Sequence, residues 1–186
     1  MRDGIVTSDE RGSREWRTAG IELPTSHPDR ARPHRYVVKV KTSLGLDASQ
    51  VARQVQGVLD DERSCVGSTA NSFSLVTDEE QADMCSTWPP RTPRSPCAGR
   101  CVRRTWSCNT GARVVLNADR WRWMTPTYTD RVQYRAYLVN HEVGHSIGLG
   151  HVGCPGPGRP APVMMQQSKS LGGCQVNPWP AASGWR

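Results

Sequence analysis

The segment from His141 to His151 constrains the fold of this chain more than any other. It reads His-Glu-x-x-His-x-x-Gly-x-x-His. Because His141 and His145 are four residues apart, a helix would place them one turn apart on the same face. Gly148 lets the backbone leave that helix in a conformation that costs other residues energy. This exit predicts that His151 returns toward the first two histidines, so the fold must bring three imidazoles together.

The helix that carries the first two histidines is predicted to begin after Asp130, which can cap it, with Gln133 in the third position. Apolar residues at helical spacing form one predicted core face: Val132, Ala136, Val139, Val143 and Ile147. The opposite face carries the two histidines, Tyr134 and Leu138. We expect the helix to end near 148–150, because glycine readily ends a helix.

Three histidine ligands leave a fourth position for water, which is the catalytic arrangement of zinc rather than the structural one. The sequence therefore predicts one catalytic Zn²⁺ held by His141, His145 and His151. Zinc lowers the pKa of a bound water from about 15.7 to about 7. Glu142 is placed to act as the general base, taking the proton and passing it to a leaving amine. The alternative is a metal site without catalysis.

Seven cysteines in a chain of 186 residues favour disulfides and an oxidising compartment. The alternative is a second metal site, because Cys97 and Cys101 have a spacing that zinc sites sometimes use. The odd number leaves at least one thiol free or paired between chains.

The same segment resembles the metzincin zinc metallopeptidases, in which these histidines are followed by a tight turn that carries a methionine. Ala161-Pro162-Val163-Met164 is similar to that turn, so Met164 is the expected methionine beneath the histidines. The alternative is that Met164 and Met165 are ordinary core residues.

More closely, residues 140–180 resemble an actinobacterial family of secreted or envelope-anchored metzincin-like domains of unknown function. The resemblance covers roughly residues 36–180 and implies two disulfides, Cys154 with Cys174 and Cys85 with Cys108. It leaves Cys65, Cys97 and Cys101 as extras. It also implies an extracellular or cell-envelope location. No signal peptide is visible in residues 1–34, so a truncated N-terminus or a cytoplasmic location stays open.

The expected fold class is α+β, a minimal metzincin-like (zincin) domain. We expect a small twisted mixed sheet with a backing helix, the active-site helix and a short disulfide-tied C-terminal subdomain. Residues 1–35 are predicted to be a disordered polar tail, residues 36–180 the domain, and residues 181–186 a C-terminal tail.

Local patterns predict the elements of that domain. Strands are expected at 36–40, 73–76 and 114–116. A helix capped by Asp47 carries an apolar stripe, namely Val51, Val55, Val58 and Leu59. Residues 86–112 are rich in Pro, Arg, Gly and Ser and are predicted to be a long loop.

The net charge of +7 comes from 24 basic residues, of which only Lys39, Lys41 and Lys169 are lysines. The arginines are scattered and accompany no nucleic-acid motif, so no nucleic-acid partner is expected. No apolar run approaches the 18 or so residues of a membrane span. We expect a monomer that acts on a peptide or protein substrate.

Metzincins bind substrate as a strand added to a sheet edge, and Arg113–Asn117 is one candidate edge, although its apolar run also fits a central strand. Trp121 and Trp123 either line a pocket or pack in the core. The first functional hypothesis is a zinc metalloendopeptidase. The alternatives are a non-catalytic zinc-containing envelope or interaction module and an amidase for cell-wall peptides.

Overall fold

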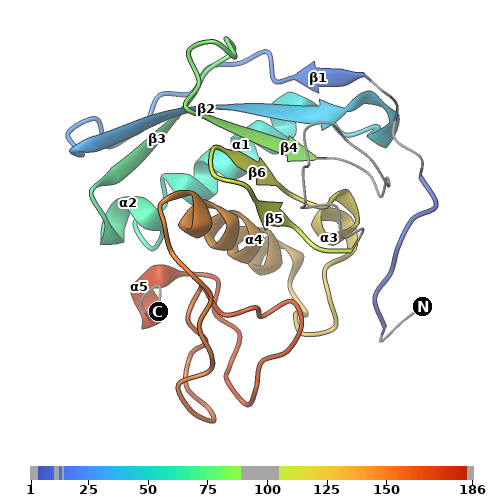
Figure 1. Ribbon diagram of the computed structural model, residues 1–186, viewed down its shortest axis with the longest axis vertical. Helices are drawn as coiled ribbons and strands as arrows, with labels where there is room; N and C mark the ends of the chain where they lie inside the picture. The colour runs from blue at the N-terminus through green and yellow to red at the C-terminus, as the bar shows by residue number, and fades with distance from the viewer. Residues whose placement is uncertain (1–3, 11–12, 14, 89–104, 184–186) are drawn as a thin grey trace.

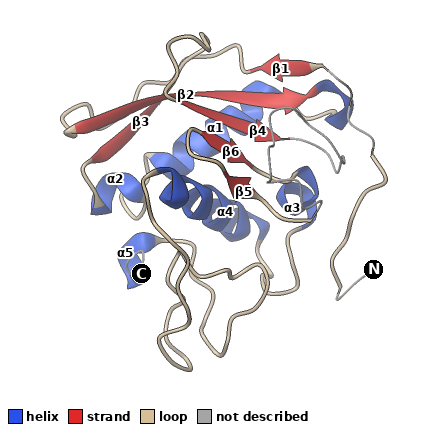
Figure 2. Ribbon diagram, viewed as in Figure 1, coloured by secondary structure: helices blue, strands red, loops and turns tan. Residues whose placement is uncertain are grey.

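The computed structural model describes residues 4–10, 13, 15–88 and 105–183. A mixed β-sheet forms one layer, and helices α1 and α4 lie against one of its faces (Figures 1 and 2). The strands are β1 (Trp16–Thr18), β2 (Arg32–Lys41), β3 (Asn71–Leu75), β4 (Met84–Trp88), β5 (Cys108–Asn109) and β6 (Arg113–Val115). The arrangement agrees with the expected α+β class.

Around this sheet the described chain forms short and long helices. They are a 3-10 turn at Thr42–Leu44, α1 (Ala48–Leu59), α2 (Cys65–Ser68), α3 (Ala118–Trp123), α4 (Arg131–Ser146) and α5 (Pro180–Ser183). Across the parts of the chain that the structure describes, none of the helices has the length and apolar character that crossing a membrane requires.

The strand order is β1-β2-β4-β6-β5, and β3 also pairs with β2. β2 is parallel to β3 and β4, β4 is parallel to β6, and the β1–β2 and β5–β6 pairs are antiparallel. β6 therefore lies between β4 and β5, so of the two alternatives for Arg113–Asn117 the central strand is confirmed and the edge is wrong. Its apolar residues Val114 and Val115 are buried in the sheet, as is usual for a strand with neighbours on both sides. β5 is the outermost described strand at this end.

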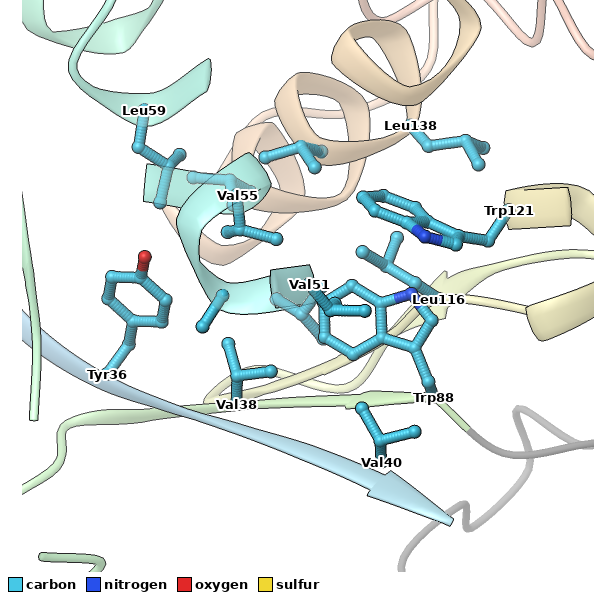
Figure 3. Close-up of a cluster of buried hydrophobic side chains, with 14 of the residues drawn as sticks. Tyr36, Val38, Val40, Val51, Val55, Leu59, Trp88, Leu116, Trp121 and Leu138 are labelled. Carbon is cyan, nitrogen blue, oxygen red and sulfur yellow. The ribbon is translucent and has the colours of Figure 1, made fainter. Parts of the chain in front are cut away.

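β2 and α1 form as the sequence predicts and supply much of the core. Tyr36, Val38 and Val40 alternate along β2 and point toward the helices (Figure 3). The Asp47 carboxylate caps α1 by accepting a hydrogen bond from the Gln50 backbone N–H at 2.8 Å. The apolar stripe of α1, which begins with Val51, packs against these residues of β2.

Two tryptophans fill the other end of the core. Trp88 at the end of β4 and Trp121 in α3 meet edge to face, with ring centroids 5.3 Å apart. Figure 3 shows both rings beneath Leu138 of α4. Trp121 is thus a core residue, whereas Trp123 is 40% exposed.

The N-terminal segment is part of the domain, so the prediction of a disordered tail over residues 1–35 is wrong for the described part of it. β1 pairs with the end of β2, and Ala19 is fully buried. The Ser8 hydroxyl donates to the Asp119 carboxylate at 2.6 Å. Polar contacts and backbone pairing hold much of this segment, and Ala19, Ile21 and Leu23 alternate with exposed residues and pack against the core. This short alternation is a strand-like signal that the prediction of a disordered tail overlooked.

Two other predicted boundaries change as well. Residues 86–88 belong to β4 and residues 108–109 form β5, so the predicted loop over 86–112 is shorter at both ends. At the C-terminus, α5 includes residues 181–183 of the expected tail, and the Ala181 N–H donates to the Arg63 carbonyl.

Candidate metal centre

Helix α4 begins at the predicted cap, where the Asp130 carboxylate accepts hydrogen bonds from the Val132 and Gln133 backbone N–H groups. Val132 is 77% exposed, so it is wrong to place it on the core face. It lies in the first turn, outside the packed part of the helix. From Tyr134 to Gly144 nearly every residue is buried, because the sheet and α1 cover one side and the C-terminal segment lies over the other.

Gly148 ends the helix and turns the chain. Its φ is +90°, a conformation that side chains with a Cβ rarely adopt. The Gly148 N–H donates to the His145 carbonyl and the Leu149 N–H to the Gly144 carbonyl, which together make a Schellman motif. The same turn brings the Leu149 carbonyl to 2.8 Å from Nδ1 of His145.

The three predicted histidines come together at this turn. Nε2 of His151 lies 3.2 Å from Nε2 of His141 and 3.1 Å from Nε2 of His145. The three side chains, one buried, one half-buried and one exposed, offer ligand atoms within 4.8 Å of one another and could hold a metal ion.

Hydrogen bonds on the far side of two rings decide which nitrogens face the centre. Nδ1 of His141 lies 2.8 Å from the Val163 carbonyl, as Nδ1 of His145 does from that of Leu149. Since a carbonyl only accepts, both Nδ1 atoms carry a proton, and in the neutral form of each ring the Nε2 atom then presents a lone pair. Metal-binding histidines are typically oriented by this kind of bond. Nε2 of His151 can donate a proton to only one of the other two Nε2 atoms. At least two nitrogen lone pairs therefore face each other at the centre, and a bound cation would remove their repulsion.

Burial favours the ligand form of His141. It lowers the pKa of this imidazole from its ordinary value to about 3, with smaller contributions from the neighbouring histidines and Lys169. The ring is thus neutral at physiological pH. Tyr137, one helical turn earlier, packs against it with ring centroids 5.3 Å apart.

Glu142 lies beside the first histidine in a buried position. Its Oε2 has no hydrogen-bond partner within the described structure. Burial raises the pKa of this carboxyl to about 8. A buried carboxylate without partners is costly, and a cation at the histidines would compensate for its charge.

The segment after His151 forms the expected tight turn. The Met165 N–H donates to the Pro162 carbonyl at 3.0 Å, and Met164 within this turn is fully buried. The turn also presents the Val163 carbonyl to His141. Met165 instead packs with Ala161 and the Cys154–Cys174 disulfide, which is the predicted C-terminal pair.

The other predicted disulfide is wrong. Cys85 carries a thiol, whereas Cys108 is disulfide-bonded with another residue. Cys85 lies in β4 opposite Arg113 of β6, while Cys108 in β5 lies opposite Val115, so β6 separates the two. Cys97 and Cys101, named as extras or as a second metal site, lie outside the described residues. Cys65 is a buried thiol.

A cleft of about 630 Å³ opens over the histidines. Its walls come from β5, from α4 and from the segment after the tight turn, and they include Trp106, Asn109 and Lys169. Trp121 and Trp123 do not line it. The Asn109 amide donates to the Ser146 hydroxyl at 2.6 Å and to the Glu142 carbonyl at 3.3 Å, which ties β5 to α4. Nothing in the sequence around Trp106 and Asn109 singled out these two residues.

No curated protein and no solved structure matches the chain. One family model does match, over residues 2–181, and it is described as "Protein of unknown function (DUF3152)". Because this match spans nearly the whole sequence, including the N-terminal segment and the histidine cluster, the chain belongs to the DUF3152 family.

Proposed function

We propose that the protein is a zinc-dependent metalloendopeptidase of the metzincin type. The observation that carries the proposal is the convergence of three Nε2 atoms, with the rings of His141 and His145 oriented from behind by carbonyl groups. Tetrahedral zinc with bonds of 2.0–2.1 Å places its ligands roughly 3.3 Å apart. The distances of 3.1 and 3.2 Å from His151 to the other two nitrogens are close to that value.

The donor set also favours zinc over calcium and magnesium. Three imidazole nitrogens, with no carboxylate in the cluster that the described residues form, suit zinc and disfavour calcium and magnesium, which take oxygen ligands. When bound, the zinc ion would supply an acidic water molecule and a positive charge for the carbonyl oxygen of a peptide.

Glu142 would hold and move the proton. Its buried carboxyl, with Oε2 unpartnered, lies next to His141 in a cleft that a substrate can enter. A base whose pKa is raised toward neutrality is well matched to accept a proton and release it to a leaving amine. A peptide in the cleft would lie beside β5, the outermost described strand next to the histidines.

The disulfide between Cys154 and Cys174 supports an oxidising environment for the protein. We therefore propose that it acts outside the cytoplasm, in the cell envelope or beyond it.

The test compares wild type with Glu142→Ala on denatured casein and on mixed peptides, both after zinc loading. Wild type should cleave, chelation should abolish cleavage, and Glu142→Ala should bind zinc without cleaving. Adding cell-wall peptides to the assay separates the endopeptidase from an amidase. Folded, zinc-loaded wild type that cleaves none of these substrates would contradict the proposal and favour a non-catalytic module.

A further inference from the structure

We propose that Lys169 selects substrates that carry a carboxylate near the scissile bond, as an acidic side chain or as the end of a peptide chain. The inference rests on the proposed function, because it concerns the specificity of the same cleft.

Charged groups in the cleft wall are few and predominantly positive. Apart from the histidines, the described lining residues with charged side chains are Arg120, Glu142 and Lys169. Arg120 is fully buried and donates to the backbone carbonyls of Met124 and Val6. Glu142 is the proposed base. Among the lining residues that the structure describes, Lys169 is thus the cation that a bound peptide can contact directly.

No acidic side chain in the described part of the chain forms an ion pair with Lys169, and its side chain is exposed. Its ammonium group lies 5.8 Å from the ring centroid of Trp106, another residue of the cleft wall. This is within the distance at which a cation is attracted to an indole ring.

The backbone around Lys169 is held in place, so the charge is presented by a rigid support. Its own N–H donates to the Gln166 carbonyl at 2.9 Å. The neighbouring Gln167 is fully buried, and the Ser168 hydroxyl lies 3.0 Å from the Tyr134 hydroxyl. A positioned cation loses less entropy when it pairs with a ligand than a freely moving one.

A carboxylate is the group that fits this surface. It would pair with the ammonium group, and the net charge of +7 would favour its approach over a long range. A substrate lysine at the same place would meet a like charge, which is unfavourable. Specificity for acidic peptides therefore follows from one side chain rather than from the overall charge alone.

The experiment uses fluorescein-labelled alanine–glycine peptides with one central Glu, Gln or Lys, each with a free or an amidated C-terminus. Cleavage by the zinc-loaded full chain is measured for wild type and Lys169→Gln. Binding to zinc-loaded Glu142→Ala, with and without Lys169→Gln, is measured by fluorescence anisotropy. The control for loss of one positive charge is Lys41→Gln, because Lys41 also lies over an indole ring, 4.1 Å from the centroid of Trp16, but is buried and does not line the cleft.

Wild type and Lys41→Gln should prefer the Glu peptide over the Gln peptide by about threefold to fivefold, the upper part of the range for exposed ion pairs. Lys169→Gln should lose this preference, mainly through KM, and raised salt should weaken it in wild type. The free-versus-amidated pair reports whether a chain terminus serves as well as a side chain.

Equal handling of all peptides by wild type would overturn the inference, as would a preference that survives in Lys169→Gln. Cleavage without any charge preference would leave the proposed function standing and refute only the role of Lys169. If the protein discriminates between the peptides in binding but cleaves none of them, the role of Lys169 would stand and the proposed function would be refuted.

Discussion

Gln167 offers the sharpest test of how the C-terminal segment supports the histidines. Its side chain is fully buried and makes four hydrogen bonds. The amide nitrogen donates to the carbonyls of Pro162 and Asn177 at 3.1 and 2.8 Å. The amide oxygen accepts from the Tyr128 hydroxyl at 2.7 Å and from the Asn177 N–H at 3.0 Å. One side chain thus ties the tight turn to the final segment and to Tyr128.

Replacing this residue by alanine removes all four bonds and leaves their partners buried. At about 1 kcal/mol for each bond, Gln167→Ala should lower the free energy of unfolding by about 4 kcal/mol. The turn that presents the Val163 carbonyl to His141 should loosen too, so zinc affinity should fall by about tenfold or more, as for other residues that orient metal ligands.

The free energy is measured by guanidinium unfolding of the metal-free protein, and zinc affinity by competition with a chromophoric chelator. Gln175→Ala is the matched control, because Gln175 is exposed on the same segment and bonds through its backbone. If Gln167→Ala is as stable as Gln175→Ala and binds zinc equally well, the reasoning about this support is refuted.

Three further predictions concern the frame of the site. Gly148→Ala should lower the free energy of unfolding by about 1–2 kcal/mol, because the φ of +90° at this position is unfavourable for alanine. Zinc titration of this variant should show weaker binding, and an unchanged zinc affinity would contradict the role of the turn. Replacing Cys154 and Cys174, which are 20 residues apart, by serine should lower stability in denaturant by about 3 kcal/mol, and equal stability with and without reductant would argue against the bond. Burial raises the pKa of the Cys65 thiol to about 12, above the value of about 8.5 for an unfolded thiol. The stability this thiol contributes is therefore complete below pH 8.5 and is lost as the pH rises toward 12. Between pH 8 and 10.5 the denaturant midpoint of Cys65→Ala should fall less than that of wild type, and an identical fall in both proteins would refute the assignment.

The parts of the fold that could be predicted from sequence are those with strong local patterns. Asp47 and Asp130 have the capping side chains, and the residues after them have helical spacing, so α1 and α4 begin where expected. The convergence of the three histidines is predictable for the same reason, because a helical repeat followed by a glycine specifies the local backbone geometry.

The parts that could not be predicted depend on contacts between distant segments. β1 pairs with β2 through backbone groups, which leave no pattern in the side chains of residues 16–18. Asn109 and Lys169 are 60 positions apart in the sequence, and both line the cleft because the sheet and the tight turn bring their segments together there. The predicted disulfide between Cys85 and Cys108 depends on a family resemblance alone. The strand order shows that β6 lies between the two cysteines.

X-ray absorption spectroscopy of the zinc-loaded protein shows whether His141, His145 and His151 jointly bind one zinc ion. Joint binding predicts one zinc per chain with three imidazole nitrogens and one oxygen at about 2.0–2.1 Å. His151→Ala should then show one imidazole fewer. Sulfur ligands at about 2.3 Å, or an unchanged spectrum in His151→Ala, would contradict it.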